Sequence, residues 1–223
     1  MAKRGVIIVA GGSGRRMGGT LPKQFMILGG MPVVGRTINT FAEALPGCDI
    51  VVVLPEEHIP LWENLASRFD IAPHRCVAGG KERFHSVACG VEALPQETEY
   101  IAVHDGVRAL VSKTLIIRAM LAAEKHKAVI PVTEVVNSYR RLLDDGTTEH
   151  MDRSRLRIVQ TPQIFNADIL RKAYNRPYDE HFTDDASVVE AAGGIVYCVE
   201  GEARNIKLTT PEDLEYAEWL LSR

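Results

Sequence analysis

Residues 5–24, GVIIVAGGSGRRMGGTLPKQ, decide the fold class of this chain. They begin with an apolar run at 5–10, which predicts a buried strand, and continue into a glycine-rich loop over about 11–20. In open α/β sheets, ligands bind at the carboxyl ends of the strands. Glycines let the backbone approach a ligand closely and turn successive N–H groups toward an anion. The stretch therefore predicts an α/β protein with an anion site after its first strand.

Short β-branched runs alternate with longer segments of helical spacing along most of the chain. Because the runs are nearly continuous in apolar residues, we expect strands that helices cover on both faces. Parallel strands with right-handed helical crossovers form a doubly wound, mostly parallel sheet, which is the predicted fold. Further strands are expected at 49–54, 100–105, 128–132, 157–165, 195–199 and 205–208, and helices at 33–45, 59–69, 82–94, 113–125, 168–174, 184–192 and after Pro211.

A polar segment at about 133–157 interrupts this pattern. It places the turn residues Asp144, Asp145 and Gly146 between short strand-like stretches, which predicts a protruding β-arm. A two-stranded hairpin is marginally stable alone, so we expect the arm to pack on another surface, such as a second subunit. No linker or internal repeat divides the sequence, and the expectation is a single domain over 1–223 that includes the arm.

The composition excludes several classes of protein. Of the 223 residues, 46% are hydrophobic and 25% are charged, as in ordinary globular proteins, and the formal net charge is -3. A general nucleic-acid binder would be strongly basic. The four cysteines are scattered without a CxxC pair, and the apolar run at 6–10 is too short for a signal peptide or a membrane span. We expect a cytoplasmic protein that binds neither nucleic acid nor a membrane.

The glycine loop does not fit two well-known phosphate motifs. A dinucleotide fingerprint would use Gly12 and Gly14 but needs a glycine where Met17 stands, and no acidic residue follows at the required distance, which weighs against an NAD-dependent oxidoreductase. A P-loop needs Lys and then Ser or Thr after its last glycine, whereas Gly19 is followed by Thr20 and Leu21.

Three basic residues accompany the loop. Arg15 and Arg16 lie within it and Lys23 follows it, an arrangement suited to a triphosphate whose charge is neutralised during transfer. The alternative is a flexible surface turn with solvated basic side chains. The position of the loop at the carboxyl end of the first strand favours the phosphate site.

Seven motifs, in order along the chain, carry a resemblance to a known family. The chain resembles the 2-C-methyl-D-erythritol 4-phosphate cytidylyltransferase family, of the Rossmann-like nucleotidyltransferase superfamily. The resemblance implies transfer of a cytidylyl group from CTP to that polyol phosphate, giving 4-diphosphocytidyl-2-C-methyl-D-erythritol and diphosphate in the non-mevalonate isoprenoid pathway. The motifs are GGSGRRMG (11–18), PKQ (22–24), GGKERFHSV (79–87), HDGVR (104–108), QTPQIF (160–165), TDDAS (183–187) and NIKLTTPEDL (205–214).

The resemblance implies a catalytic set of three cations. Arg16 and Lys23 would contact the triphosphate and stabilise the charge that develops at its α-phosphate, and Lys207 would lie near the transferred phosphate. Losing one such preorganised group commonly costs on the order of 10²- to 10³-fold in rate. A phosphate nucleophile is already anionic at neutral pH and needs no general base, so we expect His104 to be structural.

Two binding sets follow from the same resemblance. Ser86 is expected to line the cytidine pocket, with a helix N-cap as its alternative role. Arg153 and Ser138 match arm residues that reach across a dimer interface, which implies a homodimer with arm exchange. The nucleotide-binding residues would be Ala10, Gly11, Gly12, Gly14, Gly80, Ser86 and Asp105, and the substrate-binding residues Asp105, Arg108, Ser138, Arg153 and Thr183.

The sequence leaves the metal and the polyol less defined. A divalent ion, such as Mg²⁺, is expected on the triphosphate oxygens, because no protein cage is evident; Asp184 and Asp185 could form a metal pair but are more typical of a helix N-terminus. Asn137, Ser138 and Ala109 depart from the family's pattern. Ribitol 5-phosphate cytidylyltransferase is therefore an alternative, and a catalytically silent nucleotide-binding regulator is the alternative of another class.

Overall fold

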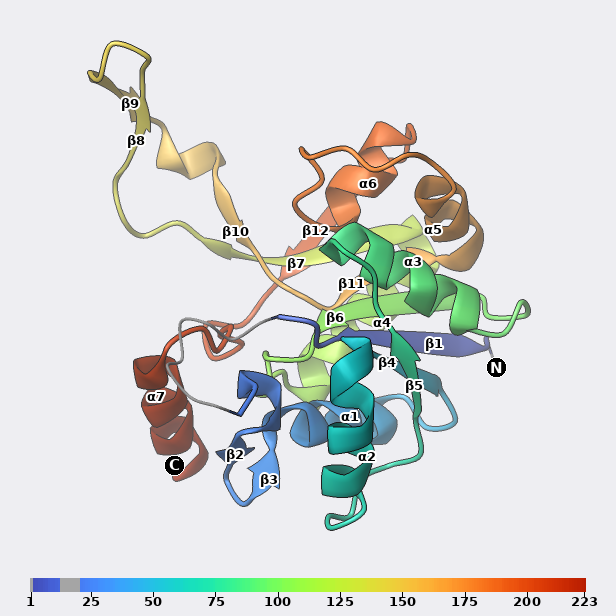
Figure 1. Cartoon of the computed structure of the whole chain (residues 1–223). Helices are drawn as coiled ribbons and strands as arrows, with labels where there is room; N and C mark the ends of the chain where they lie inside the picture. The colour runs from blue at the N-terminus through green and yellow to red at the C-terminus, as the bar shows by residue number, and fades with distance from the viewer. Residues whose placement is uncertain (1, 13–20) are drawn as a thin grey trace.

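The computed structural model describes residues 2–12 and 21–223. Within these ranges, eight strands form one sheet in the order β10-β7-β11-β6-β1-β4-β5, with β12 paired to β7 (Figure 1). Its strands are β1 (Arg4–Val9), β4 (Asp49–Leu54), β5 (Arg75–Ala78), β6 (Tyr100–Asp105), β7 (Ala128–Glu134), β10 (Arg157–Val159), β11 (Gln163–Asn166) and β12 (Tyr197–Glu200).

Most strand pairs of this sheet are parallel. β1 pairs in parallel with β4 and β6, β4 with β5, and β7 with β12, whereas β11 and β10 run antiparallel to their neighbours. The helices are α1 (Val33–Ala44), α2 (Ile59–Ala66), α3 (Arg83–Ala93), α4 (Lys113–His126), α5 (Ala167–Tyr174), α6 (Asp185–Ala191) and α7 (Pro211–Leu221), with short 3-10 turns η2 (Lys23–Phe25), η3 (Glu56–His58) and η4 (Arg153–Arg155).

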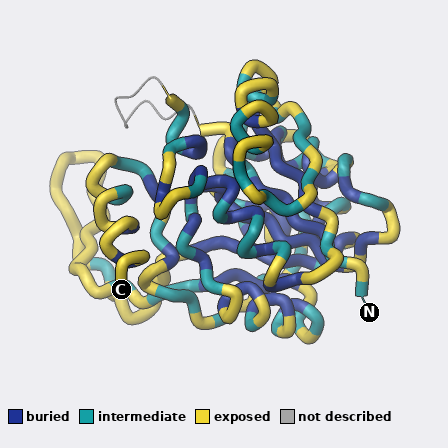
Figure 2. Tube along the Cα trace, turned by 90° about the horizontal axis from the view of Figure 1, so that it is seen from below, coloured by how far each residue is buried: buried dark blue, intermediate teal, exposed yellow. Residues whose placement is uncertain are grey.

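The core lies on both faces of the sheet. Successive side chains of a strand point to opposite faces, so Val6 and Ile8 of β1 pack in one cluster with α1 and α4. Ile7, between them, packs in a second cluster with α3, α5 and α6. Figure 2 shows these buried strands between helices whose outer sides are exposed. The predicted doubly wound, mostly parallel α/β sheet is confirmed.

Several predicted elements differ from those in the structure. The short edge strand β5 was not predicted, and the helix expected at 59–69 ends at Ala66. The strand expected at 157–165 is divided around Pro162, which has no N–H for a ladder hydrogen bond. The strand expected at 195–199 begins at Tyr197. Residues 205–208 form no strand, because their Leu208 N–H bonds to the Val107 carbonyl in the loop after β6.

The β-arm is confirmed and stands clear of the main sheet. Its hairpin pairs β8 (Tyr139–Leu142) with β9 (Thr148–Met151), and Figure 1 shows it projecting from β7 and β10. Val136 and Leu142 are each 73% exposed. A second small hairpin, β2 (Ile27–Leu28) with β3 (Met31–Pro32), lies near α7. Within the described ranges, no helix combines the length and apolar character needed to cross a bilayer.

Candidate active site

Two cavities adjoin at the carboxyl ends of β1 and β6. The first has a volume of about 240 Å³ and lies between the end of β1, the turn η2 and the start of α3. The second, of about 260 Å³, lies over β11 and the segment before α6. Three charged residues, Arg83, Asp105 and Lys207, line both cavities. The two cavities therefore share a charged junction formed by these three residues.

The cavities gather most of the residues that the sequence predicts. The first holds eight of them, and the second holds four, two of which belong to both. Those of the first are Ala10, Gly11, Gly12, Lys23, Gly80, Ser86, Asp105 and Lys207, and those of the second are Asp105, Arg108, Thr183 and Lys207.

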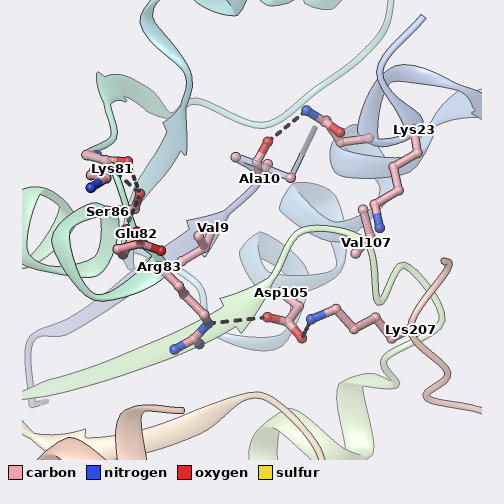
Figure 3. Close-up of a pocket in the computed structure, with 14 residues that line it drawn as sticks. Val9, Ala10, Lys23, Lys81, Glu82, Arg83, Ser86, Asp105, Val107 and Lys207 are labelled. Carbon is pink, nitrogen blue, oxygen red and sulfur yellow. Dashed lines mark hydrogen bonds and ion pairs between the residues drawn. The ribbon is translucent and has the colours of Figure 1, made fainter. Parts of the chain in front are cut away.

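Asp105, the last residue of β6, anchors the junction. Figure 3 shows Lys207 and Arg83 on either side of it, with Lys207 Nζ 3.1 Å from its Oδ2 and Arg83 Nε 3.8 Å from its Oδ1. Arg108 Nε lies 3.2 Å from the same Oδ2. Burial raises the pKa of Asp105, but Lys207, Arg83 and Arg108 together hold it well below its usual range. The carboxylate is therefore ionised, and it holds three cations where the cavities meet.

The turn η2 places Lys23 beside the end of β1. Gln24 is fully buried and its Nε2 donates a 2.8 Å hydrogen bond to the Ala10 carbonyl. Phe25 stacks on Trp62 of α2, with 5.6 Å between ring centroids. These two contacts fix the turn, and Figure 3 shows the Lys23 side chain extending from it toward the cavity. A Cβ on Gly12 would approach Lys23 Cε to 3.7 Å, so the backbone and the lysine stem lie close together.

The loop before α3 forms the opposite wall. Ser86 Oγ accepts a 3.2 Å hydrogen bond from the Gly80 N–H. A Cβ on Gly80 would lie 2.4 Å from the Cβ of His85, so only glycine fits there. α3 begins at Arg83 with Glu82 at the N-cap, so the alternative role of Ser86 as an N-cap is wrong. Ser86 lies in the first turn of the helix and fixes the Gly80 backbone.

His104 is structural in this arrangement. Its ring is fully buried, with Nε2 3.3 Å from the Arg108 carbonyl and Nδ1 2.9 Å from Thr161 Oγ1. A carbonyl oxygen can only accept, so the proton lies on Nε2 and the Thr161 hydroxyl donates to Nδ1. Thr161 Oγ1 in turn accepts the Asp105 N–H at 3.1 Å. Burial lowers the pKa of His104 to about 3, so the ring is neutral. His104 thus supports the backbone of Asp105.

The two acidic residues before α6 have different roles. Asp184 is the N-cap of α6, in a capping box with Ser187, as its interpretation as a helix acid predicts. Asp185 is fully buried and pairs with Arg83. Within the described part of the chain, no group of three or more His, Cys, Asp or Glu residues is arranged to hold a metal ion.

Four predicted residues are not found in the cavities. Gly14 and Arg16 lie outside the described residues. Ser138 and Arg153 belong to the arm and line neither cavity; the Arg153 guanidinium donates to the Val136 carbonyl instead. Arg140, on the same arm, bonds to Thr148 within the hairpin.

The structure adds cavity residues that the sequence did not single out. Arg83 and Thr161 lie inside two of the seven motifs. Their partners, Asp185 and His104, are far away along the chain, so no local sequence pattern indicates either contact. Gln163 is also buried; it donates to Asp184 Oδ2 at 2.8 Å and accepts the Ala186 N–H at 2.9 Å. These bonds tie the segment that carries Thr183 to β11.

Comparison with known sequences gives a consistent result along the whole chain. A profile of the family described as IspD, 2-C-methyl-D-erythritol 4-phosphate cytidylyltransferase, matches residues 5–223. A relative of that name from Bacteroides fragilis is 48% identical over 220 residues, covering 98% of this chain and 99% of the relative. Another, from Bacteroides thetaiotaomicron, is 46% identical over 220 residues, covering 98% and 100%.

Solved structures agree with the sequence comparison. The crystal structure of 4-diphosphocytidyl-2C-methyl-D-erythritol synthase from Anaerococcus prevotii is similar with a TM-score of 0.85 and 28% identity. The similarity covers 100% of this chain and 99% of the other. The likeness therefore extends over the sheet, the cavities and the arm together.

Proposed function

The chain belongs to the 2-C-methyl-D-erythritol 4-phosphate cytidylyltransferase family, and we propose that the two adjoining cavities are its active site. It is a nucleotidyltransferase that transfers a cytidylyl group from CTP to the polyol phosphate in isoprenoid biosynthesis. The observation that carries the site assignment is the junction, where Arg83, Arg108 and Lys207 converge on Asp105. A junction rich in cations suits the meeting of two phosphates.

We assign CTP to the first cavity. Its walls include the backbone at Ala10, Gly11, Gly12 and Gly80, which suits close approach of a nucleotide. Ser86 fixes the Gly80 backbone, so that backbone polar groups can recognise the edge of the base. Gly14 and Arg16, by resemblance, would complete the triphosphate site from the loop outside the described residues.

We assign the polyol phosphate to the second cavity. Thr183 and Arg108 line it, and Asp105 can accept hydrogen bonds from polyol hydroxyls at the junction. This placement directs the substrate phosphate toward the α-phosphorus of CTP. Asp105 thus belongs to both binding sets, as the resemblance implies.

The reaction then needs positioning and charge stabilisation. An oxygen of the polyol phosphate forms a bond to the α-phosphorus, the bond from that phosphorus to the oxygen bridging it to the β-phosphate breaks, and diphosphate leaves in line. The attacking phosphate is largely ionised at neutral pH, so no general base is required. Lys23, Lys207 and Arg16 are the proposed catalytic residues, because fixed cations stabilise the charge that develops on the transferring phosphoryl group.

A divalent ion, Mg²⁺ or another, is proposed on the triphosphate. The first cavity offers the carboxylates of Glu82 and Asp105, and Asp105 already holds three cations. A metal held by protein ligands alone therefore does not fit the described residues. Phosphate oxygens and water would supply most of its ligands, as Mg²⁺ commonly prefers.

A homodimer with exchanged arms is also proposed. The arm exposes Val136, Tyr139 and Leu142, apolar surface that a second subunit would cover. Arg153 and Ser138 would then reach the polyol phosphate bound by the neighbouring subunit. A single domain over 1–223 and a cytoplasmic location stay predictions; the shared sheet from β1 to β12 supports the first.

The test is diphosphate release from CTP and Mg²⁺. The reaction is run with 2-C-methyl-D-erythritol 4-phosphate and with ribitol 5-phosphate in parallel, and UTP and ATP serve as nucleotide controls. We expect release only with CTP and the first polyol. Release with ribitol phosphate alone would keep the chemistry and change the substrate. Silence with every pair would leave a nucleotide-binding regulator.

A further inference from the structure

Arg83 lies against both cavities and is held from behind by a buried carboxylate. Its Nη1 and Nη2 donate to Oδ1 and Oδ2 of Asp185 at 3.0 and 2.7 Å, a bidentate pair, and Asp185 is fully buried. The Tyr174 hydroxyl donates to Asp185 Oδ1 at 2.6 Å. Asp185 is thus fixed by α3 and α5 at once, and the orientation of the Arg83 guanidinium is fixed with it.

The pair leaves part of the guanidinium available. An arginine has five N–H donors, and a bidentate pair uses two of them. Among the described residues, the remaining N–H groups have no hydrogen-bond acceptor; the nearest carboxylate oxygen to Nε is Asp105 Oδ1 at 3.8 Å. Figure 3 shows the Arg83 side chain directed at Asp105, from the side opposite Lys207. The unused Nε–H group therefore lies at the junction, beside Asp105.

Stability alone is a poor explanation for this buried pair. Removing two charges from water costs free energy that their attraction often fails to recover, so such pairs frequently persist for other reasons. Burial lowers the pKa of Arg83, but Asp185 and Asp105 raise it above its ordinary value, so the charge persists. The molecule thus keeps a rigid cation where its two cavities meet.

We infer that Arg83 binds the reacting phosphates, with Asp185 as the positioning residue that holds its guanidinium toward them. This inference rests on the proposed assignment of the cavities to CTP and the polyol phosphate. Arg83 lines both cavities, so it can contact oxygens of the α-phosphate and of the attacking phosphate together. Such a contact is complete only as the two phosphates join. Its loss therefore lowers kcat more than it raises either KM.

The variant must avoid leaving a buried charge without a partner. Arg83→Ala alone would strand the Asp185 carboxylate and could prevent folding. The double variant Arg83→Gln with Asp185→Asn places two amides where the ion pair stood. A matched control is the double variant Arg4→Gln with Glu124→Gln. It removes another ion pair, in which Arg4 Nη2 lies 3.0 Å from Glu124 Oε1 at the start of β1. Arg83→Lys keeps the charge without the fork.

Steady-state kinetics and thermal unfolding are measured on all variants. For the double variant at Arg83 and Asp185, we expect kcat to fall by about 10²-fold, with each KM changed by less than about 5-fold and the unfolding temperature near that of the control. Arg83→Lys is expected to recover part of kcat. The control variant at Arg4 and Glu124, which lie outside both cavities, is expected to keep kcat within about 3-fold.

Two results would overturn the inference. The first is a folded double variant whose kcat stays within about 3-fold of that of the unmodified chain. A double variant that loses activity only as far as it loses thermal stability, with the same relation in the Arg4 and Glu124 control, would count equally against the inference. The second is silence of the unmodified chain with CTP and the polyol phosphate. That silence overturns the proposed function, and with it this inference, whereas the first result leaves the proposed function intact.

Discussion

Lys207 holds its ammonium nitrogen 3.1 Å from Oδ2 of Asp105, across the junction of the two cavities. Asp105 ends a central strand, and Lys207 lies in the segment whose Leu208 N–H bonds to the Val107 carbonyl. Arg108 shares the same carboxylate oxygen at 3.2 Å. One negative charge therefore fixes the positions of the cations that are proposed to face the transferred phosphate, and its removal should disturb them together.

Asp105→Asn tests this role. The amide keeps the shape of the carboxylate but cannot neutralise Lys207, Arg83 and Arg108, which would repel one another. We expect kcat/KM for the polyol phosphate to fall by roughly 10- to 100-fold, the size of a lost hydrogen bond to a charged group. Steady-state kinetics measure it, with Asp49→Asn, an exposed residue at the start of β4, as the control. Equal activity of the two variants would show that the Asp105 carboxylate is not needed to hold these cations for the reaction.

Lys23→Ala tests the cation beside the end of β1. We expect turnover to fall on the order of 10²- to 10³-fold, because a fixed charge toward the triphosphate is lost, while the thermal unfolding temperature changes little. Arg16→Ala is expected to behave alike. The control is Lys172→Ala, an exposed lysine on α5 that lines neither cavity. Near-normal turnover in both Lys23→Ala and Arg16→Ala would contradict the proposed triphosphate site.

The sequence predicts the sheet because its central strands are buried on both faces. The runs of β1, β4 and β6 are nearly continuous in apolar residues, a pattern typical of strands that helices cover on both faces. The edge strand β5 is short and only partly buried, so its pattern resembles a loop. Residues 205–208 have the composition of a strand, yet they pack over the loop after β6 rather than on the sheet.

The residues of the site also differ in whether the sequence alone predicts them. Glycine-rich turns at strand ends have a local signature, so Gly12 and Gly80 could be predicted from the chain itself. The pairing of Arg83 with Asp185 joins residues 102 positions apart, and no spacing rule indicates it. Its physical basis is burial: a carboxylate removed from water must find a cation, and only the folded chain shows which one.

The arm yields a prediction about the substrate. Arg153→Ala should raise the KM for the polyol phosphate by about 10-fold or more and leave the KM for CTP within about 2-fold, because the arm is proposed to reach only the polyol phosphate of the neighbouring subunit. Arg141→Ala is the control, since Arg141 pairs with Glu149 inside the hairpin. Equal effects on both KM values would contradict the role of the arm.

Mixed dimers test whether the site is shared between subunits. An Arg153→Ala chain and a Lys23→Ala chain should each be impaired, but in a mixed dimer one of the two sites would combine an intact Lys23 with an intact Arg153 from the partner. We therefore expect partial recovery of activity after subunit exchange. Native mass spectrometry verifies the mixing. No recovery in verified mixed dimers would show that each chain completes its own site.

The buried ring of His104 predicts how stability depends on pH. Its pKa is lowered to about 3 by burial, whereas an unfolded histidine titrates near 6.5. Between these values the unfolded chain binds a proton that the folded chain does not, so this contribution to stability is present above about pH 6.5 and is lost as the pH falls. The expected slope is about 1.4 kcal/mol per pH unit below about pH 6.

His104→Gln isolates that slope. The glutamine can donate to the Arg108 carbonyl and accept from Thr161, as the neutral ring does, but it does not titrate. Urea unfolding at about pH 7.5 and about pH 5.5 should show a smaller loss of stability in the variant than in the unmodified chain. The pKa of Asp105 is also lowered, so its contribution to stability is lost only at lower pH, as the pH falls through the usual titration range of an aspartate and below. His150→Gln, at an exposed site on the arm, is the control. A slope in His104→Gln equal to that of the unmodified chain would show that His104 is not the group responsible.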